Sequence, residues 1–408
     1  MEKKNAKIDR RNFLKTVGAA GLGSVLASAE TNAADPSPST KTEESEPPQV
    51  PRRKLGKTGV EVSCLALGTI FNVLEKQILL RKSLQWGVTY WDTAYGYTGG
   101  NSERGIGKYL SKNPDVRKEL FIVSKASDAR TVADVEKRLQ TSLERMNTKY
   151  IDLYYGVHEL DDPARLTSEL KQWAEDAKKR KLIRFFGFST HKNMAKCLAA
   201  AAELDWIDAI MTTYNFRVMQ DPEMQTAVEA CHKAGIGLIA MKTQAKEIKT
   251  KEDKELAEHF LQSGFTEGQA KVKIVLEDKR ISSACVGRDN LTHLQLNIAA
   301  VLDKTKLTQA DMNVLKEYAQ ATCSGYCAGC AHICESALPD APYVSDIMRY
   351  LMYYNSYGEQ KEARELFAKI PSRVRDKLLS ADYSQAEARC PQHLPIAKLI
   401  AEAVSKLA

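Results

Sequence analysis

The stretch VTYWDTAYGYTGGNSERGIGKYLSKNPDVRKELFIVSK, residues 88–125, carries the pattern that decides the fold. Two short apolar runs, 89–92 and 120–124, are typical of buried strands, and a polar residue closes each run. Between them, residues 102–112 have the apolar spacing of an amphipathic helix. The stretch therefore predicts one strand–helix–strand unit of a parallel sheet.

The same alternation continues along most of the chain. The other predicted strands are residues 64–68, 151–157, 184–188, 207–211, 237–241 and 283–286. The other predicted helices are residues 132–147, 163–179, 192–202, 222–234, 254–263, 267–277 and 290–302. Eight strands alternating with helices over about 250 residues indicate an α/β fold, a (β/α)8 TIM barrel. A doubly wound open sheet would require a glycine-rich turn after an early strand, and the sequence has none. Residues 53–63 look like a hairpin that caps the bottom of the barrel.

Composition excludes several classes of protein. The chain has 408 residues, of which 43% are hydrophobic and 27% are charged, as in ordinary soluble globular proteins. The net charge of +7 comes from interspersed basic and acidic residues, which argues against a nucleic-acid partner. After the N-terminal region no apolar run reaches about 20 residues, so we expect no membrane span after processing.

The N-terminal region resembles a twin-arginine export signal. Arg10 and Arg11 precede a weakly apolar run at residues 16–29, which ends in the small residues Ala-Ser-Ala. We therefore predict a signal peptide at residues 1–34 and a disordered linker at residues 35–51. The expected location is periplasmic or exported, with the twin-arginine translocase as a partner. An ordinary frayed N-terminal helix is the alternative.

Four polar residues follow consecutive predicted strands. Asp92, Lys125 and His158 close the second, third and fourth strands, and Tyr97 lies in the loop after Asp92. In a barrel these strand ends share one rim, where active sites form. Each residue alone has an ordinary structural explanation, such as an Asp that caps a helix or a buried His with all its hydrogen bonds made. Together they predict a catalytic site.

The chemistry of this set suits reduction of a carbonyl group. Hydride transfer leaves negative charge on oxygen, so a proton donor is needed, and a free Tyr with a pKa of about 10 donates poorly. The Lys125 ammonium is expected to lower the pKa of Tyr97, and the Asp92 carboxylate to hold Lys125 in place. The imidazole of His158 can orient the carbonyl.

The chain from residue 53 to about residue 303 resembles the aldo/keto reductase family. The likeness rests on Asp92-Thr93-Ala94…Tyr97…Gly100-Asn101-Ser102-Glu103, Ile151-Asp152-Leu153-Tyr154 running to His158, Gly187-Phe188-Ser189, and Tyr214-Asn215. The resemblance implies that Asp92, Tyr97, Lys125 and His158 form the catalytic tetrad, with Tyr97 as general acid/base. It also implies a nicotinamide cofactor, NADP in preference to NAD, bound without a Rossmann domain.

The resemblance further implies which residues bind the cofactor. By position these are Ser189 at the carboxamide, Lys242 beside the cofactor path, Gly287, Arg288 and Asn297 at the phosphates, and His293 near the adenosine 2′-phosphate. Thr190 and Met211 depart from the family pattern, which has Asn and Gln there.

The C-terminal segment, residues 305–408, is rich in cysteine. Four thiols within twelve residues indicate metal binding or disulfides. The segment resembles the α-helical ferredoxin-like extension of one aldo/keto reductase branch, which implies one [4Fe–4S] cluster on Cys323, Cys327, Cys330 and Cys390. Extensions of this kind have two cysteine motifs, and each motif gives its fourth thiolate to the other cluster. Here the second motif keeps only Cys390, so Cys334 would have no complete cluster to bind. A zinc site on Cys323, Cys327, Cys330 and Cys334, or disulfides formed after export, remain alternatives.

The sequence as a whole predicts an exported oxidoreductase. It would move hydride between NADP or NAD and a small aldehyde, ketone or sugar. Either the cofactor stays bound and is recycled by paired half-reactions, or the cluster exchanges electrons with an external carrier. The alternatives are a carbohydrate-binding protein or an electron-transfer protein built on a retained reductase barrel.

Overall fold

The computed structural model describes residues 47–245, 251–287, 290–338 and 343–408. The chain divides into two units, Met1–Pro47 and Pro48–Ala408. The predicted signal peptide and most of the predicted linker lie outside the described residues. The account below therefore concerns the second unit.

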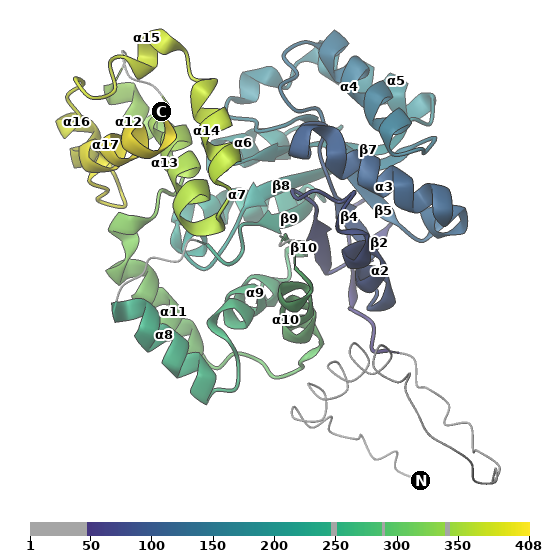
Figure 1. Ribbon diagram of the computed structural model, residues 1–408, viewed down its shortest axis with the longest axis horizontal. Coiled ribbons are helices and arrows are strands. Elements are labelled where there is room, and N and C mark those ends of the chain that lie inside the picture. The colour runs from purple at the N-terminus through teal and green to yellow at the C-terminus, as the bar shows by residue number, and fades with distance from the viewer. Residues whose placement is uncertain (1–46, 246–250, 288–289, 339–342) are drawn as a thin grey trace, which may run out of the picture. The chain divides into compact units, whose positions relative to one another are not determined.

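A closed parallel barrel forms the centre of this unit, in the order β10-β3-β4-β5-β6-β7-β8-β9 (Figure 1). Its strands are β3 (Leu65–Gly68), β4 (Tyr90–Asp92), β5 (Phe121–Lys125), β6 (Ile151–Val157), β7 (Ile183–Thr190), β8 (Ala209–Thr213), β9 (Gly237–Met241) and β10 (Ile281–Val286). All eight predicted strands are present, so the predicted barrel is confirmed. β7 extends two residues beyond its predicted end, which places Ser189 and Thr190 inside the strand.

Helices surround the barrel and connect its strands. They are α2 (Gln77–Gln85), α3 (Asn101–Lys112), α4 (Val132–Arg145), α5 (Ser168–Lys179), α6 (Met194–Ala202), α7 (Pro222–Lys233), α8 (Lys251–Gln262), α9 (Glu267–Glu277) and α10 (Leu291–Leu302). The helix predicted from residue 163 begins later, at Ser168. Its first turn is a separate 3-10 turn, because Leu166 leaves the helical conformation and the Thr167 side chain caps the new start.

A β-hairpin closes the bottom of the barrel, as the sequence predicts. Its strands β1 (Arg52–Lys54) and β2 (Glu61–Ser63) pair in antiparallel fashion. Leu55 and Val62 are fully buried and pack with barrel residues that include Tyr90 and Leu153. Because the hairpin closes this end, the opposite rim is left to carry the polar strand ends.

The C-terminal segment is helical and has its own apolar core. Its helices are α11 (Gln309–Ala321), α12 (Ala331–Cys334), α13 (Val344–Met352), α14 (Gln360–Ala368), α15 (Ser372–Arg375), α16 (Ser384–Arg389) and α17 (Ile396–Leu407). Helix α13 ends at Met352, and a wider π-type turn, η7 (Tyr353–Tyr357), follows. None of the described helices combines the length and apolarity needed to cross a bilayer.

This segment packs against the carboxyl-terminal rim of the barrel (Figure 1). Lys192, just after β7, pairs with Glu335 at 2.9 Å and with Asp346 at 3.2 Å. Asn193 donates its backbone N–H to the carbonyl of Gly329 at 2.8 Å. The C-terminal helices therefore lie over part of the rim where the predicted catalytic residues end.

Candidate active site

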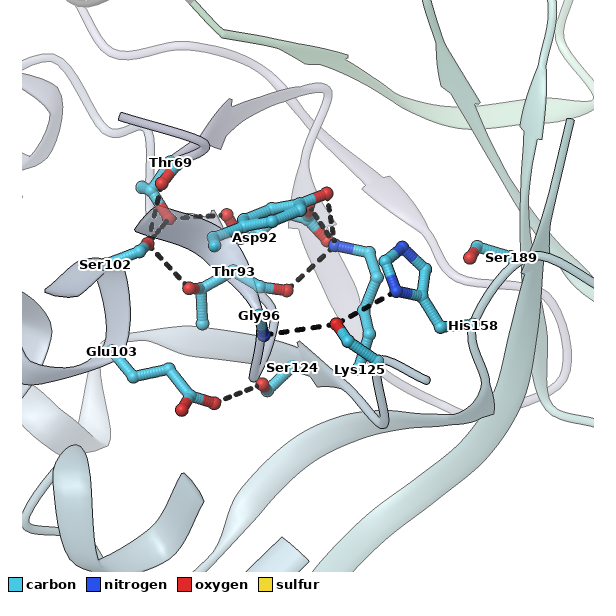
Figure 2. A network of polar contacts seen from close by, with 12 residues as sticks. Thr69, Asp92, Thr93, Gly96, Ser102, Glu103, Ser124, Lys125, His158 and Ser189 are labelled. Carbon is cyan, nitrogen blue, oxygen red and sulfur yellow. Dashed lines mark hydrogen bonds and ion pairs between the residues drawn. The ribbon is translucent and has the colours of Figure 1, made fainter. Parts of the chain in front are cut away.

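A buried ion pair joins the ends of β4 and β5. Lys125 Nζ lies 2.6 Å from Asp92 Oδ1 and donates a second hydrogen bond, of 2.8 Å, to the carbonyl of Thr93. Both side chains are almost fully buried. The two strands are neighbours in the barrel, so the last residues of both point into the same space (Figure 2).

Tyr97 and His158 complete the predicted set. Tyr97 begins the short turn after β4, and its hydroxyl lies 3.4 Å from Lys125 Nζ. The ring of His158, which follows β6, lies edge-on to Tyr97, with 6.2 Å between ring centroids. The structure therefore brings all four predicted catalytic residues together.

Ser127 orients the imidazole and was not predicted. Its Oγ lies 3.0 Å from His158 Nδ1 and accepts a 3.1 Å hydrogen bond from the backbone N–H of Gly96. A hydroxyl oxygen has two lone pairs, so Ser127 can donate to or accept from Nδ1; when it donates, the proton of the neutral imidazole lies on Nε2. A single Ser two residues after a strand has no distinctive spacing, so the sequence offered no signal for this role.

The electrostatics of the site correct one sequence expectation. Burial, with a further contribution from Asp92, raises the pKa of Tyr97 well above its usual value, whereas the sequence argument predicted a lowering. The reason is that the phenol is buried, and the nearby Asp92 carboxylate further disfavours the phenolate. Burial also lowers the pKa of His158 to about 4. At neutral pH the site therefore holds a protonated phenol, a neutral imidazole and an ion pair.

The remaining residues of the tyrosine loop motif are structural. Glu103 is fully buried and binds Ser124 Oγ at 2.7 Å and Arg145 at 3.0 Å. Ser102 donates its hydroxyl to the carbonyl of Thr69 at 2.6 Å (Figure 2). These bonds fix the loop that carries Tyr97.

The predicted cofactor residues lie on the same rim. Ser189 is buried near the end of β7, and its Oγ accepts from the backbone N–H of Glu159 at 3.2 Å. Asn297 on α10 is buried, and its Oδ1 accepts from Gln244 at 3.1 Å. Nδ1 of His293, in the first turn of α10, is buried with no hydrogen-bond partner among the described residues. Gly287 directly follows β10, and Arg288 lies outside the described residues.

Two residues of the C-terminal segment also reach the site. Lys242, after β9, donates to the hydroxyl of Tyr353 at 2.9 Å. Arg349 pairs with Glu159, the neighbour of His158, at 2.8 Å. Tyr353 and Arg349 were not among the predicted site residues, because the sequence around them carries no pattern that places these side chains at the barrel rim.

The cysteines are arranged differently from the predicted ligand set. Cys327, Cys330, Cys334 and Cys390 line one small cavity, whereas Cys323, on a separate 3-10 turn, is absent from its lining. All the cysteines are free thiols, and burial raises the pKa of Cys327 to about 11 and that of Cys334 to about 12. Within the described ranges, no three His, Cys, Asp or Glu side chains converge as ligands of a single metal ion.

Comparison with known proteins bears out the family resemblance. The model of the aldo/keto reductase family matches residues 68–320. An aldo-keto reductase of Gibberella moniliformis is 27% identical over 175 residues, which cover 41% of this chain and 51% of that protein. The L-galactose dehydrogenase of Arabidopsis thaliana is 22% identical over 296 residues, or 65% of this chain and 92% of that protein. The chain thus spans only about half the length of the first of these relatives.

Solved structures show the same architecture. The holo form of aldo-keto reductase AKR11C1 from Bacillus halodurans superposes with a TM-score of 0.55 at 19% identity. The match covers 66% of this chain and 96% of that one. At this identity the likeness shows the fold alone, and the residues of the site must carry the chemistry.

Proposed function

Since the chain belongs to the aldo/keto reductase family of oxidoreductases, we propose that it transfers hydride between NADP and the carbonyl or alcohol group of a small molecule. The observation that carries the proposal is the assembled set of Asp92, Lys125, Tyr97 and His158 on one rim of the barrel. A barrel that only bound a ligand would have no need of a phenol set against a buried ammonium.

Each residue has a distinct task in the reduction. Tyr97, protonated at neutral pH, donates its proton to the carbonyl oxygen as that oxygen gains charge. Lys125, 3.4 Å away, stabilises the phenolate that forms, and Asp92 fixes the position of Lys125. His158, with Nδ1 engaged by Ser127, offers its Nε2–H to the same carbonyl oxygen. In the oxidation of an alcohol the phenolate takes the proton back.

The described residues fit a phosphorylated dinucleotide. Among the described residues the buried His293 Nδ1 lacks a partner, Asn297 is buried four residues further along α10, and Ser189 is buried near the end of β7. We assign these three residues, with Gly287, to cofactor binding, since a phosphate can also use the N–H groups at the start of α10. When bound, the nicotinamide supplies or accepts the hydride.

The test is a comparison of the full chain with its Tyr97→Phe variant. With NADPH and 4-nitrobenzaldehyde as the probe, the variant should lose activity by about 10²–10⁴-fold, the usual contribution of general acid catalysis. Its affinity for NADPH, measured by fluorescence quenching, should not change, because the hydroxyl contacts the substrate. A variant as active as the parent chain would overturn the assignment.

We also propose that the chain is exported by the twin-arginine translocase. The support is the sequence pattern around Arg10 and Arg11 and the small residues that follow it. Replacing both arginines with lysine should retain the precursor inside the cell, as seen by fractionation and immunoblotting. An unchanged distribution would contradict the proposal.

For the C-terminal segment we propose one [4Fe–4S] cluster held by Cys327, Cys330, Cys334 and Cys390. The support is that these four thiols surround one cavity. The resemblance of this cysteine-rich segment to a ferredoxin-like extension favours a cluster over zinc. An external electron carrier would then be the partner of this segment.

Iron and sulfide analysis, with the visible absorbance of anaerobically purified protein, tests this ligand set. Cys334→Ser should lose iron and colour, while Cys323→Ser should keep both. The opposite result would restore Cys323 as the ligand, and an iron-free parent chain would refute the cluster.

A further inference from the structure

The segment that follows β6 connects His158 with Ser189 of β7 (Figure 2). Glu159 comes directly after His158, and its backbone N–H donates to Ser189 Oγ at 3.2 Å. The next N–H, of Leu160, donates to the carbonyl of Ser189 at 2.7 Å. Glu159 has a left-handed backbone, with φ of +64°, which residues other than glycine seldom adopt. Such a conformation persists only where surrounding contacts hold it, so the position of His158 depends on what holds Glu159.

The C-terminal segment holds the Glu159 side chain. Its Oε1 lies 2.8 Å from a guanidinium nitrogen of Arg349 on α13. Among the described residues, the other basic group within salt-bridge distance is the ring of His191, at 4.0 Å. Burial and the nearby Lys242 lower the pKa of His191 well below its usual value, so that ring is neutral at pH 7. In the described part of the chain, Arg349 is thus the one cation that touches Glu159.

Several groups set the charge of the His158 imidazole. Burial is the largest cause that lowers its pKa to about 4. Among the charged groups, two carboxylates raise this pKa and two cations lower it: Glu159 and Asp128, and Lys125 and Arg349. The neutral groups beside the ring are Tyr97, Ser127 and His191. Because burial and the cations outweigh the carboxylates, the imidazole is neutral at pH 7.

Both of these carboxylates are paired with cations of the C-terminal segment. Arg349 binds Glu159, and Lys369, at the C-terminal end of α14, lies 3.0 Å from Asp128. The side chains of Arg349 and Glu159 are 9% and 39% exposed, whereas those of Lys369 and Asp128 are 58% and 70% exposed. Solvent and salt screen the more exposed pair. The C-terminal segment therefore balances the acidic neighbours of His158 mainly through Arg349.

We propose that Arg349 is a positioning residue of the active site, which holds Glu159 beside His158 and balances its negative charge. The inference rests on the proposed hydride transfer and makes that reaction depend on the C-terminal segment. Without the guanidinium, the Glu159 carboxylate would draw a proton onto the imidazole, and Nδ1 could no longer accept a hydrogen bond from Ser127. The neutral imidazole that binds the carbonyl would then persist only at higher pH.

The pKa of His158 in the full chain, followed by NMR of labelled histidine, tests this charge balance. The signal is assigned by its absence from His158→Gln. Arg349→Met should raise the pKa of His158 by about one pH unit, and Arg349→Lys should restore most of the parent value. The double variant Glu159→Gln/Arg349→Met should also titrate near the parent value, because both charges are gone.

Lys192→Met is the matched control. It removes two ion pairs between the barrel rim and the C-terminal segment and leaves the partners of Glu159 and Asp128 in place. The pKa of His158 should therefore stay at the parent value. If Arg349→Met shifts this pKa no more than Lys192→Met does, the proposal is overturned. Should Arg349→Met not fold, Arg349→Gln gives the same comparison, because an amide can bind Glu159 without a charge.

The pH dependence of turnover is a second readout, which a loss of stability alone would not reproduce. With NADPH and 4-nitrobenzaldehyde, kcat/KM of Arg349→Met relative to the parent should be about twofold lower at pH 5 than at pH 7, since about half of its His158 rings are then charged. For Lys192→Met this ratio should be the same at both pH values. A shifted pKa with a constant ratio in an active parent chain would overturn the catalytic role. If the pKa shifts but the parent chain reduces no carbonyl, the hydride-transfer function fails and the charge link between Arg349 and His158 stands.

Discussion

Replacing Lys125 with Met tests the part of the mechanism that depends on charge. The ammonium lies 3.4 Å from the Tyr97 hydroxyl, and at an effective dielectric constant of about 20 a full phenolate charge there is stabilised by about 5 kcal/mol. If the proton is about half transferred in the transition state, Lys125→Met loses about 2.5 kcal/mol of transition-state stabilisation, which slows the reaction about 70-fold. The methionine side chain fills nearly the same volume as lysine, so the substitution leaves no new cavity.

A charge control is needed because Lys125 also neutralises the buried Asp92. Breaking a buried ion pair on one side costs about 3–5 kcal/mol of folding stability. The double variant Asp92→Asn/Lys125→Met removes both charges, so we expect thermal unfolding near that of the parent chain. Its rate should still fall, but by less than in Lys125→Met, because the Asp92 charge that opposes the phenolate is also removed.

The assay follows oxidation of NADPH with 4-nitrobenzaldehyde at saturating cofactor. A folded double variant that keeps the parent rate within about threefold would refute the argument, since the phenolate would then need no ammonium.

Three further predictions follow from the contacts of other residues. Since the pKa of His158 is lowered to about 4 in the folded chain from its usual 6.5, the unfolded chain takes up the proton first. The free energy of unfolding should therefore fall as the pH drops from 6.5 toward 4, and His158→Gln should flatten this dependence in urea titrations at several pH values; an unchanged slope would contradict the shift. Arg349→Met removes the ion pair with Glu159 of the barrel and the ion pair with Asp346 on the same helix, α13. We therefore expect the free energy of unfolding to fall by about 1–3 kcal/mol and the C-terminal segment to be cleaved faster by protease. As a control, Lys361→Met at an exposed position should change the free energy of unfolding by less than about 0.5 kcal/mol. Leu55→Ala leaves a cavity where the β1–β2 hairpin packs against the bottom of the barrel. The free energy of unfolding, measured by urea denaturation, should fall by about 2–4 kcal/mol, with no change in KM. A fall of less than about 1 kcal/mol would mean that the hairpin is not part of the core.

The sequence by itself determined the barrel and named the four residues of the proposed tetrad. Both follow from local patterns, because a buried parallel strand is a short apolar run and its last residue points to the rim whatever the rest of the chain does. That is why Asp92, Lys125 and His158 could be named from their positions after predicted strands. The order of the strands around a closed barrel then makes these ends neighbours.

The tertiary structure alone decided which charges meet. The pKa of Tyr97 is raised by burial and, to a smaller extent, by the Asp92 carboxylate, and neither effect is encoded in the spacing of these residues. Tyr353 and Arg349 join the site only because the C-terminal segment packs on the rim, more than a hundred residues along the chain from their partners. Cys334, and not Cys323, shares the cavity of Cys327 because the local fold of the C-terminal segment sets which thiols approach one another.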